Sequence, residues 1–277
     1  MSVKTNGKSR ARSARPKAAP LGKVEIRADD QSLTPFGGGA VVGELARRLD
    51  LIAALDRAMN DAPRVGGLKP VKQRKRGASA GEVLVALAES MLLGGDSVLD
   101  LERLRADEAG AELRAVRDVP AASTMCQLMT RFRRSHLRAA EHAFSGCANS
   151  MDLQLGRAVG GPVTLDYDST IVEVHGRQKQ GAGMTHQGQT AYQPLLCSWA
   201  QRGRILGSEL LAGNASTRGE EPRQLLARTL QCLPEGHGEV SARFDSGFYR
   251  IDLLKDCRKQ GVWFSISVPR STAMWKA

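Results

Sequence analysis

Two stretches, VTLDYDST at 163–170 and VSARFDSG at 240–247, decide the fold that this chain is expected to adopt. In each stretch apolar and polar residues alternate with the two-residue period of a β-strand, and an aspartate followed by serine ends the alternation. Asp166 and Asp168 share the polar face of the first strand, and Asp245 lies on the polar face of the second. The sequence therefore predicts two strands that carry carboxylates toward their carboxyl ends.

Carboxylates two residues apart on one strand face repel each other unless a cation neutralises them. Magnesium suits such a place, because proteins bind it through one or two carboxylates together with waters and substrate phosphate oxygens. Asp168 and Asp245 are therefore candidate metal ligands, and Asp166 is a rival for the first position. The alternative is that Asp168 and Asp245 only cap the ends of their strands. The residues alone leave both interpretations open.

The order of the surrounding elements predicts a mixed β-sheet flanked by helices. Three strands, a helix, a strand, a helix and a strand are expected at 163–174, 192–200, 203–213, 222–233, 240–245, 248–259 and 262–268. This is the order of an RNase H-like core, in which the first and the fourth strand lie side by side. Asp168 and Asp245 are then expected to be neighbours in space, although they are far apart in the sequence.

The segment 36–155 has the apolar periodicity of helices and is expected to form an all-helical, DNA-binding domain. Ser79 and Glu82 predict a capping box at the start of one helix. Thr124 and Gln127 predict the cap of a long helix that bears several arginines. A helix-turn-helix unit and a helical domain with solvated basic faces both fit this pattern. Its basic linker supplies four candidate DNA contacts, Lys72, Arg74, Lys75 and Arg76.

Charge indicates a polyanionic partner. The chain of 277 residues has a formal net charge of +11 and a pI near 9.8, which favours nucleic acid first and an acidic membrane second. The first 28 residues carry eight Lys or Arg against one Glu and no aromatic residue. We therefore expect 1–35 to be a disordered basic arm that contacts phosphates through residues such as Arg10, Arg12 and Arg15.

Composition argues against two other classes of protein. No apolar run approaches the length of a transmembrane helix, so no membrane span is expected, and nucleic acid rather than a membrane is the expected partner. The five cysteines show no CxxC spacing, which argues against a zinc site and favours free thiols in a reducing compartment.

Six strings of residues, in order along the chain, resemble one known family. They are TPFGGGAVVGELARRL at 34–49, GGDSVLDLERLRAD at 94–107, LDYDSTIVEVHGRQKQGA at 165–182, AYQPLLCSWA at 191–200, GNASTRG at 213–219 and RFDSGFY at 243–249. Together they resemble the transposases of bacterial insertion sequences, in particular the DDE type (DDE domain group 1) with an RNase H-like catalytic core. The resemblance implies a DNA transposase that cuts transposon ends and transfers strands.

The resemblance also assigns roles to residues. The family's first catalytic aspartate precedes a Ser/Thr pair, which matches Asp168, and the second precedes a short turn into a helix, which matches Asp245. Two Mg²⁺ or Mn²⁺ ions are expected in the complete enzyme. The loop after the first strand adds Arg177 and Lys179 as expected DNA contacts. The family's third residue, a glutamate beyond the last strand, has no counterpart before Ala277. We therefore expect the core at 160–277 to be incomplete and the chain to be inactive on its own.

The implied partners are double-stranded DNA, as inverted-repeat ends and target, and further copies of the chain on that DNA. The implied location is the bacterial cytoplasm, associated with the nucleoid. Two alternatives remain open at this point. One is a non-catalytic DNA-binding regulator of transposition. The other is a stand-alone RNase H-like nuclease, which needs a third acidic residue from within the chain, the nearby choices being Glu209, Glu220, Glu221 and Asp256.

Overall fold

The structure is a computed structural model, and it describes residues 30, 32–61, 70–72, 76–176, 178–217 and 219–268. Most of the expected basic arm lies outside these residues. So do six of the expected DNA contacts, namely Arg10, Arg12, Arg15, Arg74, Lys75 and Arg177.

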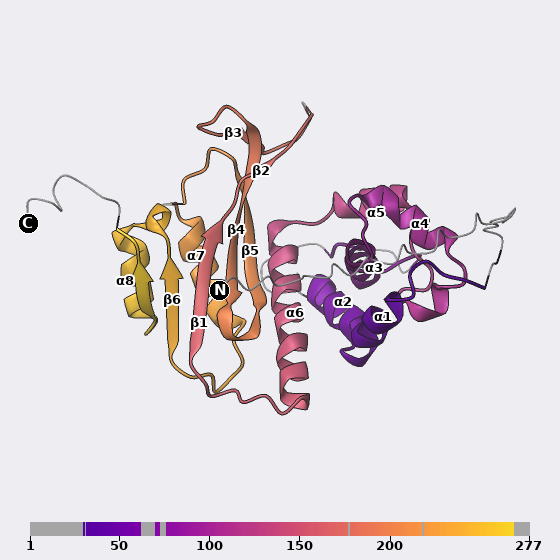
Figure 1. Cartoon of the computed structure of the whole chain (residues 1–277), viewed down its shortest axis with the longest axis horizontal. Coiled ribbons are helices and arrows are strands. Elements are labelled where there is room, and N and C mark those ends of the chain that lie inside the picture. The colour runs from indigo at the N-terminus through magenta and orange to yellow at the C-terminus, as the bar shows by residue number, and fades with distance from the viewer. Residues whose placement is uncertain are drawn as a thin grey trace, which may run out of the picture.

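The first half of the described chain is helical (Figure 1). Its α-helices are α1 (Gly39–Arg48), α2 (Leu51–Asp61), α3 (Ala80–Leu92), α4 (Leu101–Ala106), α5 (Ala122–Met129) and α6 (Arg134–Gln154). Their apolar faces meet in one core that contains Leu55, Met59, Val83, Leu104 and Met125. The predicted capping box is confirmed: the Ser79 hydroxyl accepts the Glu82 N–H, and the Glu82 carboxylate accepts the Ser79 N–H.

The single long helix expected after Thr124 was wrong. Helix α5 begins at Ala122 without a side-chain cap, and a turn separates it from α6. Arg133 has extended backbone angles, and its N–H is donated to Nδ1 of His136 over 3.0 Å. This bond caps a new helix, because it satisfies a backbone donor that a continuous helix would have paired with a carbonyl.

The second half contains a mixed sheet of seven strands. They are β1 (Val163–Ser169), β2 (Val172–Glu173), β3 (Gly183–Met184), β4 (Thr190–Trp199), β5 (Arg204–Ala212), β6 (Val240–Phe244) and β7 (Trp263–Ile266). The main strands lie in the order β5-β4-β1-β6-β7, with β1 antiparallel to β4 and parallel to β6. Helices α7 (Glu221–Gln231) and α8 (Ile251–Lys259) complete this half. The predicted element order and the neighbouring positions of the first and fourth strands are confirmed.

Two details of the expected strands were wrong. The strand expected at 163–174 is interrupted after Ser169, and its remainder, β2, pairs with the start of β4 at Ala191 and Tyr192. The expected Gly/Gln-rich connection contains β3, which pairs with Thr190 and Ala191 of β4. A long β4 therefore carries two short partners beyond the end of β1, and 171–190 projects from the sheet (Figure 1).

The predicted strand parity is confirmed. Val163, Leu165 and Tyr167 of β1 are buried in a core shared with α7 and α8, to which Leu225, Leu226, Leu253 and Cys257 contribute. The polar residues of β1 point to the opposite face of the sheet, which neither α7 nor α8 covers. The fold thus matches the expected α+β class, a mixed open sheet with flanking helices that is consistent with an RNase H-like core.

Helix α6 connects the two halves (Figure 1). It packs against α2 on one side and approaches β5 on the other. Glu141 of α6 accepts the backbone N–H of Ser208 in β5 over 2.6 Å and also pairs with Arg228 of α7. In the part of the chain that the structure describes, no helix has both the length and the apolar character that a membrane span requires.

Candidate active site

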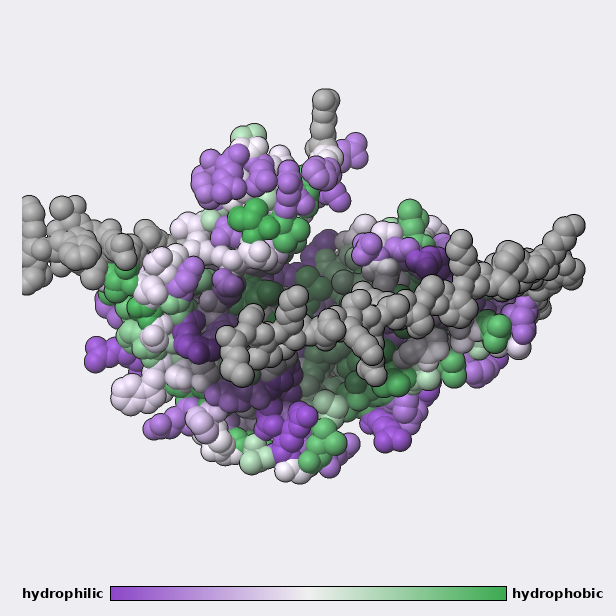
Figure 2. Space-filling view, in the orientation of Figure 1, coloured by the Kyte–Doolittle hydropathy of each residue, from purple (hydrophilic) through white to green (hydrophobic). Residues whose placement is uncertain are grey.

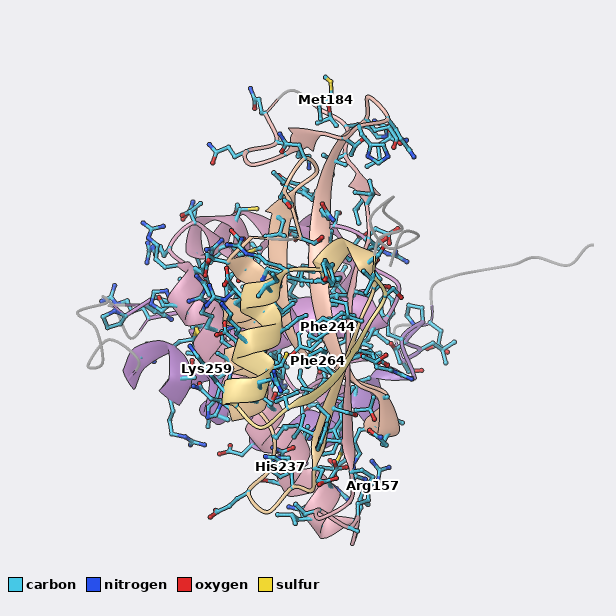
Figure 3. All side chains as sticks on the ribbon, turned by 90° about the vertical axis from the view of Figure 1, so that its left-hand side faces the viewer. Arg157, Met184, His237, Phe244, Lys259 and Phe264 are labelled. Carbon is cyan, nitrogen blue, oxygen red and sulfur yellow. The ribbon has the colours of Figure 1, made fainter. Side chains whose placement is uncertain are left out.

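The two aspartates singled out in the sequence lie together at the carboxyl ends of neighbouring parallel strands. Tyr167 of β1 is the register partner of Phe244 of β6, so Asp168 and Asp245 follow at the same level of the sheet. In Figure 3, His237 precedes β6 in the lower part of the view, Phe244 ends β6 near the middle, and Met184 of the projecting segment 171–190 lies at the top. Strand β6 therefore runs toward that segment. The carboxylates therefore lie at the end of the sheet from which that segment rises.

Each aspartate uses one carboxylate oxygen locally. Asp168 Oδ1 accepts the backbone N–H of Ser169, and Asp245 Oδ1 accepts that of Gly247, both over 2.8 Å. Asp245 thereby caps a short 3-10 helix (Ser246–Phe248) and not α8, which begins only at Ile251. Both side chains are exposed, and among the described residues neither forms an ion pair with Lys or Arg. A second oxygen of each carboxylate remains available for a ligand.

Neighbouring polar residues hold the backbone on both sides of the pair. Gln193 of β4 donates from Nε2 to the Ser169 hydroxyl over 3.1 Å. Thr217 donates from its hydroxyl to the carbonyl of Gly247 over 2.7 Å. Sequence reasoning assigned neither residue a role, although both lie in strings that carry the family resemblance. Their bonds fix the residues that follow Asp168 and Asp245, and so restrict where the two carboxylates point.

Asp166 differs from Asp168 in its surroundings. It is the register partner of Arg243, whose Nε and Nη2 donate to the two oxygens of Asp166 over 2.5 and 2.6 Å. This contact raises the pKa of Arg243. Because an arginine already neutralises Asp166, the geometry favours Asp168 as the first metal ligand and leaves Asp166 as the weaker candidate.

The acidic residues considered for a stand-alone nuclease are mostly engaged elsewhere. Glu209 is only 8% exposed and pairs with Arg134, Arg138 and Arg228. Asp256 and Glu220 both pair with Arg223, which lowers the pKa of Asp256. Carboxylates with arginine partners within the protein are poor candidates for an additional metal ligand. These contacts weigh against the stand-alone nuclease.

The carboxylate oxygens of Asp168 and Asp245 suit a hard divalent cation that keeps coordination positions for water and substrate. Within the described ranges, no group of three or more His, Cys, Asp or Glu forms a closed metal cage. Magnesium does not require one, since it retains several waters and binds substrate phosphate oxygens beside one or two carboxylates. Asp168 and Asp245, each with an available oxygen on an exposed surface, match that chemistry.

The surroundings of the pair are an open surface. A cavity of about 790 Å³ lies between α6 and β5, but apolar residues such as Leu137, Phe144 and Leu210 line much of it and neither aspartate does. Hydrophilic residues gather instead on the projecting segment at the top of the view in Figure 2. An exposed acidic pair suits a long polymer better than a small enclosed ligand.

Three of the expected DNA contacts fall on described residues. Lys179 is exposed on the projecting segment, at the same end of the sheet as the aspartates. Arg76 is exposed in the linker before α3. Lys72 donates from Nζ to the carbonyls of Gly77 and Ala78, both over 2.5 Å, so it stabilises its own linker. Their roles toward DNA stay predictions.

Comparison with known proteins identifies the family. Residues 19–277 match the family described as Transposase DDE domain group 1, and the chain belongs to that family. A solved structure, "Cryo-EM structure of piggyBac transposase synaptic complex with hairpin DNA (SNHP)", is similar with a TM-score of 0.36 and 14% sequence identity. The match covers 84% of this chain and 51% of that chain, so this chain spans about half the length of the solved one. No curated protein matches. Family membership supports a transposase function.

Proposed function

We propose that the chain is a DNA transposase in which Asp168 and Asp245 hold the divalent metal ions that cut transposon ends and transfer strands. The observation that carries this proposal is the position of the two aspartates at equal levels of β1 and β6, each exposed and without an ion-pair partner among the described residues. Asp166 is a further candidate ligand.

The metal, Mg²⁺ or Mn²⁺, supplies activation of an attacking water or 3′-hydroxyl and stabilises the leaving oxygen of an in-line displacement. The protein's own part is to fix the carboxylates. The backbone N–H groups of Ser169 and Gly247 orient one oxygen of each aspartate, and Gln193 and Thr217 form hydrogen bonds with the residues that carry those N–H groups. Because both carboxylates are exposed, a metal ion held by them would be accessible to a phosphodiester of a long DNA.

The proposed partner is double-stranded DNA, both the inverted-repeat ends and the target, with further copies of the chain assembled on it in the bacterial nucleoid. The net charge of +11 supports a polyanion as partner. Contacts through Arg76 and Lys179 are part of this proposal, as are those through Arg10, Arg12, Arg15, Arg74, Lys75 and Arg177, which lie outside the described residues.

The test is cleavage of a DNA duplex carrying the element's ends, in Mn²⁺, by a full-length member of the family, as wild type and with the aspartates that match Asp168 and Asp245 changed to asparagine. A matched control is Glu239→Gln, because Glu239 is an exposed carboxylate immediately before the other end of β6. We expect metal-dependent cleavage to require both aspartates and to tolerate the control. Cleavage that survives Asp245→Asn contradicts the assignment. DNA binding without any dependence on Asp168 or metal would instead support the non-catalytic regulator.

A further inference from the structure

One cation lies directly beside the proposed metal ligands. Arg243 of β6 lies two residues before Asp245, which follows the strand with extended backbone angles, and both side chains therefore point to the same face of the sheet. Its side chain is 60% exposed, and that of its partner Asp166 is 32% exposed. Two positions along a strand span about 6.6 Å, which is the scale of one nucleotide step along a DNA strand.

Asp166 orients this guanidinium and leaves part of it free. The bonds to Asp166 use Nε and one hydrogen of Nη2. The other N–H groups, on Nη1 and Nη2, have no partner among the described residues. They can therefore donate to a ligand, since every polar atom of a guanidinium is a donor. An arginine fixed in this bidentate geometry presents its remaining donors in a defined direction, as recognition of a phosphate requires.

A purely structural role explains this pair poorly. Strands β1 and β6 are already joined by a parallel ladder of five registered residue pairs. On the buried face, the rings of Tyr167 and Phe244 stack with their centroids 4.8 Å apart. An exposed ion pair adds little stability to such an interface. The positive charge of Arg243 is better explained by an anionic ligand that binds to this exposed face of the sheet.

We propose that Arg243 binds a backbone phosphate of the DNA beside the carboxylates of Asp168 and Asp245, and that Asp166 is the residue that positions Arg243. This inference rests on the proposed function, because it takes DNA as the substrate. Asp166 and Arg243 then have different roles. Asp166 lowers the entropy that Arg243 loses on binding, and Arg243 offsets the repulsion between the phosphates and the two unneutralised aspartates.

The experiment measures binding of a labelled random-sequence DNA duplex to the full chain, without divalent metal, over a series of salt concentrations. Loss of one phosphate contact lowers the slope of log K against log salt by about 0.9. We expect this decrease in Arg243→Gln. We expect Arg243→Lys to keep most of the slope, because it keeps the charge.

A double variant separates binding from structure. Exchange of the pair, Asp166→Arg with Arg243→Asp, keeps an ion pair between β1 and β6 but moves the cation to the other strand. We expect the exchanged pair to leave the slope reduced. Should that variant fail to fold, as judged by its thermal unfolding, the contrast between Arg243→Gln and Arg243→Lys decides alone.

Two outcomes overturn the inference while leaving the proposed function intact. One is a wild-type slope in Arg243→Gln, provided that the wild-type chain binds the duplex. The other is full restoration of the slope by the exchanged pair, which would make the contact a structural tie. Failure of the wild-type chain to bind DNA at all overturns the proposed function, and the inference with it.

Discussion

Two successive levels of β1 and β6, that is, two pairs of opposite residues on the polar face, differ in how their carboxylates are neutralised. At one level, Asp166 of β1 faces Arg243 of β6, and the protein neutralises its own carboxylate. At the next level on the same face, Asp168 lies beside Asp245, and among the described residues no cation pairs with either. Both levels lie on the same face of the sheet, and opposite β1 the chain supplies an arginine at one level and an aspartate at the other.

The difference identifies the two carboxylates that an external cation would have to neutralise. A carboxylate paired with arginine is complete in the folded chain, whereas two adjacent carboxylates repel each other until a cation joins them. The carboxylates of Asp168 and Asp245 at the strand ends therefore have no cationic partner among the described residues. Arg243, two residues before Asp245, places a positive charge next to them. In the proposals made above, a metal ion would bind at the level of Asp168 and Asp245, and a DNA phosphate at the level of Arg243.

The largest effect is expected from removing either member of the unneutralised level. In a full-length family member, the changes that match Asp168→Asn or Asp245→Asn should lower metal-dependent DNA cleavage by about a thousandfold or more, because each removes a ligand of the metal that would stabilise the leaving oxygen. Initial cleavage rates in Mn²⁺ measure this, with Glu239→Gln as the control. Equal losses in the control would assign the effect to charge in general.

A smaller effect is expected from the scaffold behind both levels. Leu165 of β1 is fully buried in the core shared with α7 and α8. Leu165→Ala should lower the free energy of unfolding by about 2–5 kcal/mol through lost burial and the cavity left behind. Thr164→Ala, on the opposite face of the same strand, should cost about 1 kcal/mol, since it removes the hydroxyl that accepts from Gln201. Urea denaturation of both variants checks this contrast, and similar losses would contradict the assigned parity.

An intermediate variant breaks the comparison directly by making the two levels alike. Arg243→Gln frees Asp166 and adds a third unneutralised carboxylate to the face. We expect Mn²⁺ affinity to rise about threefold to tenfold, because another negative oxygen ligand faces the site. Calorimetric titration of the metal measures the change. An unchanged or weaker affinity would show that Asp166 lies out of reach of the metal.

The smallest effect concerns stability. Asp168→Asn removes one of two adjacent like charges in the metal-free chain and should raise the free energy of unfolding by about 0.5 kcal/mol or less. Asp166→Asn breaks an existing pair and should change it by a similar amount in the opposite direction. Thermal unfolding without divalent metal, at low salt, distinguishes the signs. Stabilisation by both variants would contradict the pairing of Asp166 with Arg243.

Local patterns in the sequence were sufficient to predict much of this fold. The alternation through Val163, Leu165 and Tyr167 fixed the buried face of β1, because strand periodicity depends only on neighbouring residues. Element order placed β1 next to β6, and with them the two aspartates. The family resemblance distinguished Asp168 from Asp166 through the Ser169-Thr170 pair that follows it.

Contacts that depend on register or on distant side chains were not predictable in the same way. The pairing of Asp166 with Arg243 needs the exact alignment of two strands that are far apart in sequence. The break between α5 and α6 depends on a bond from the Arg133 backbone to His136. The engagement of Glu209 by three arginines depends on how α6 and α7 pack beside β5.

The most direct test of the account is a titration of Mn²⁺ into the DNA-bound chain, followed by electron paramagnetic resonance. We expect wild type and Glu239→Gln to bind the ion equally, and Asp168→Asn and Asp245→Asn each to weaken binding by about tenfold or more, or roughly 1.4 kcal/mol. A double variant, Asp168→Asn with Asp245→Asn, that binds Mn²⁺ as tightly as the wild type would contradict it.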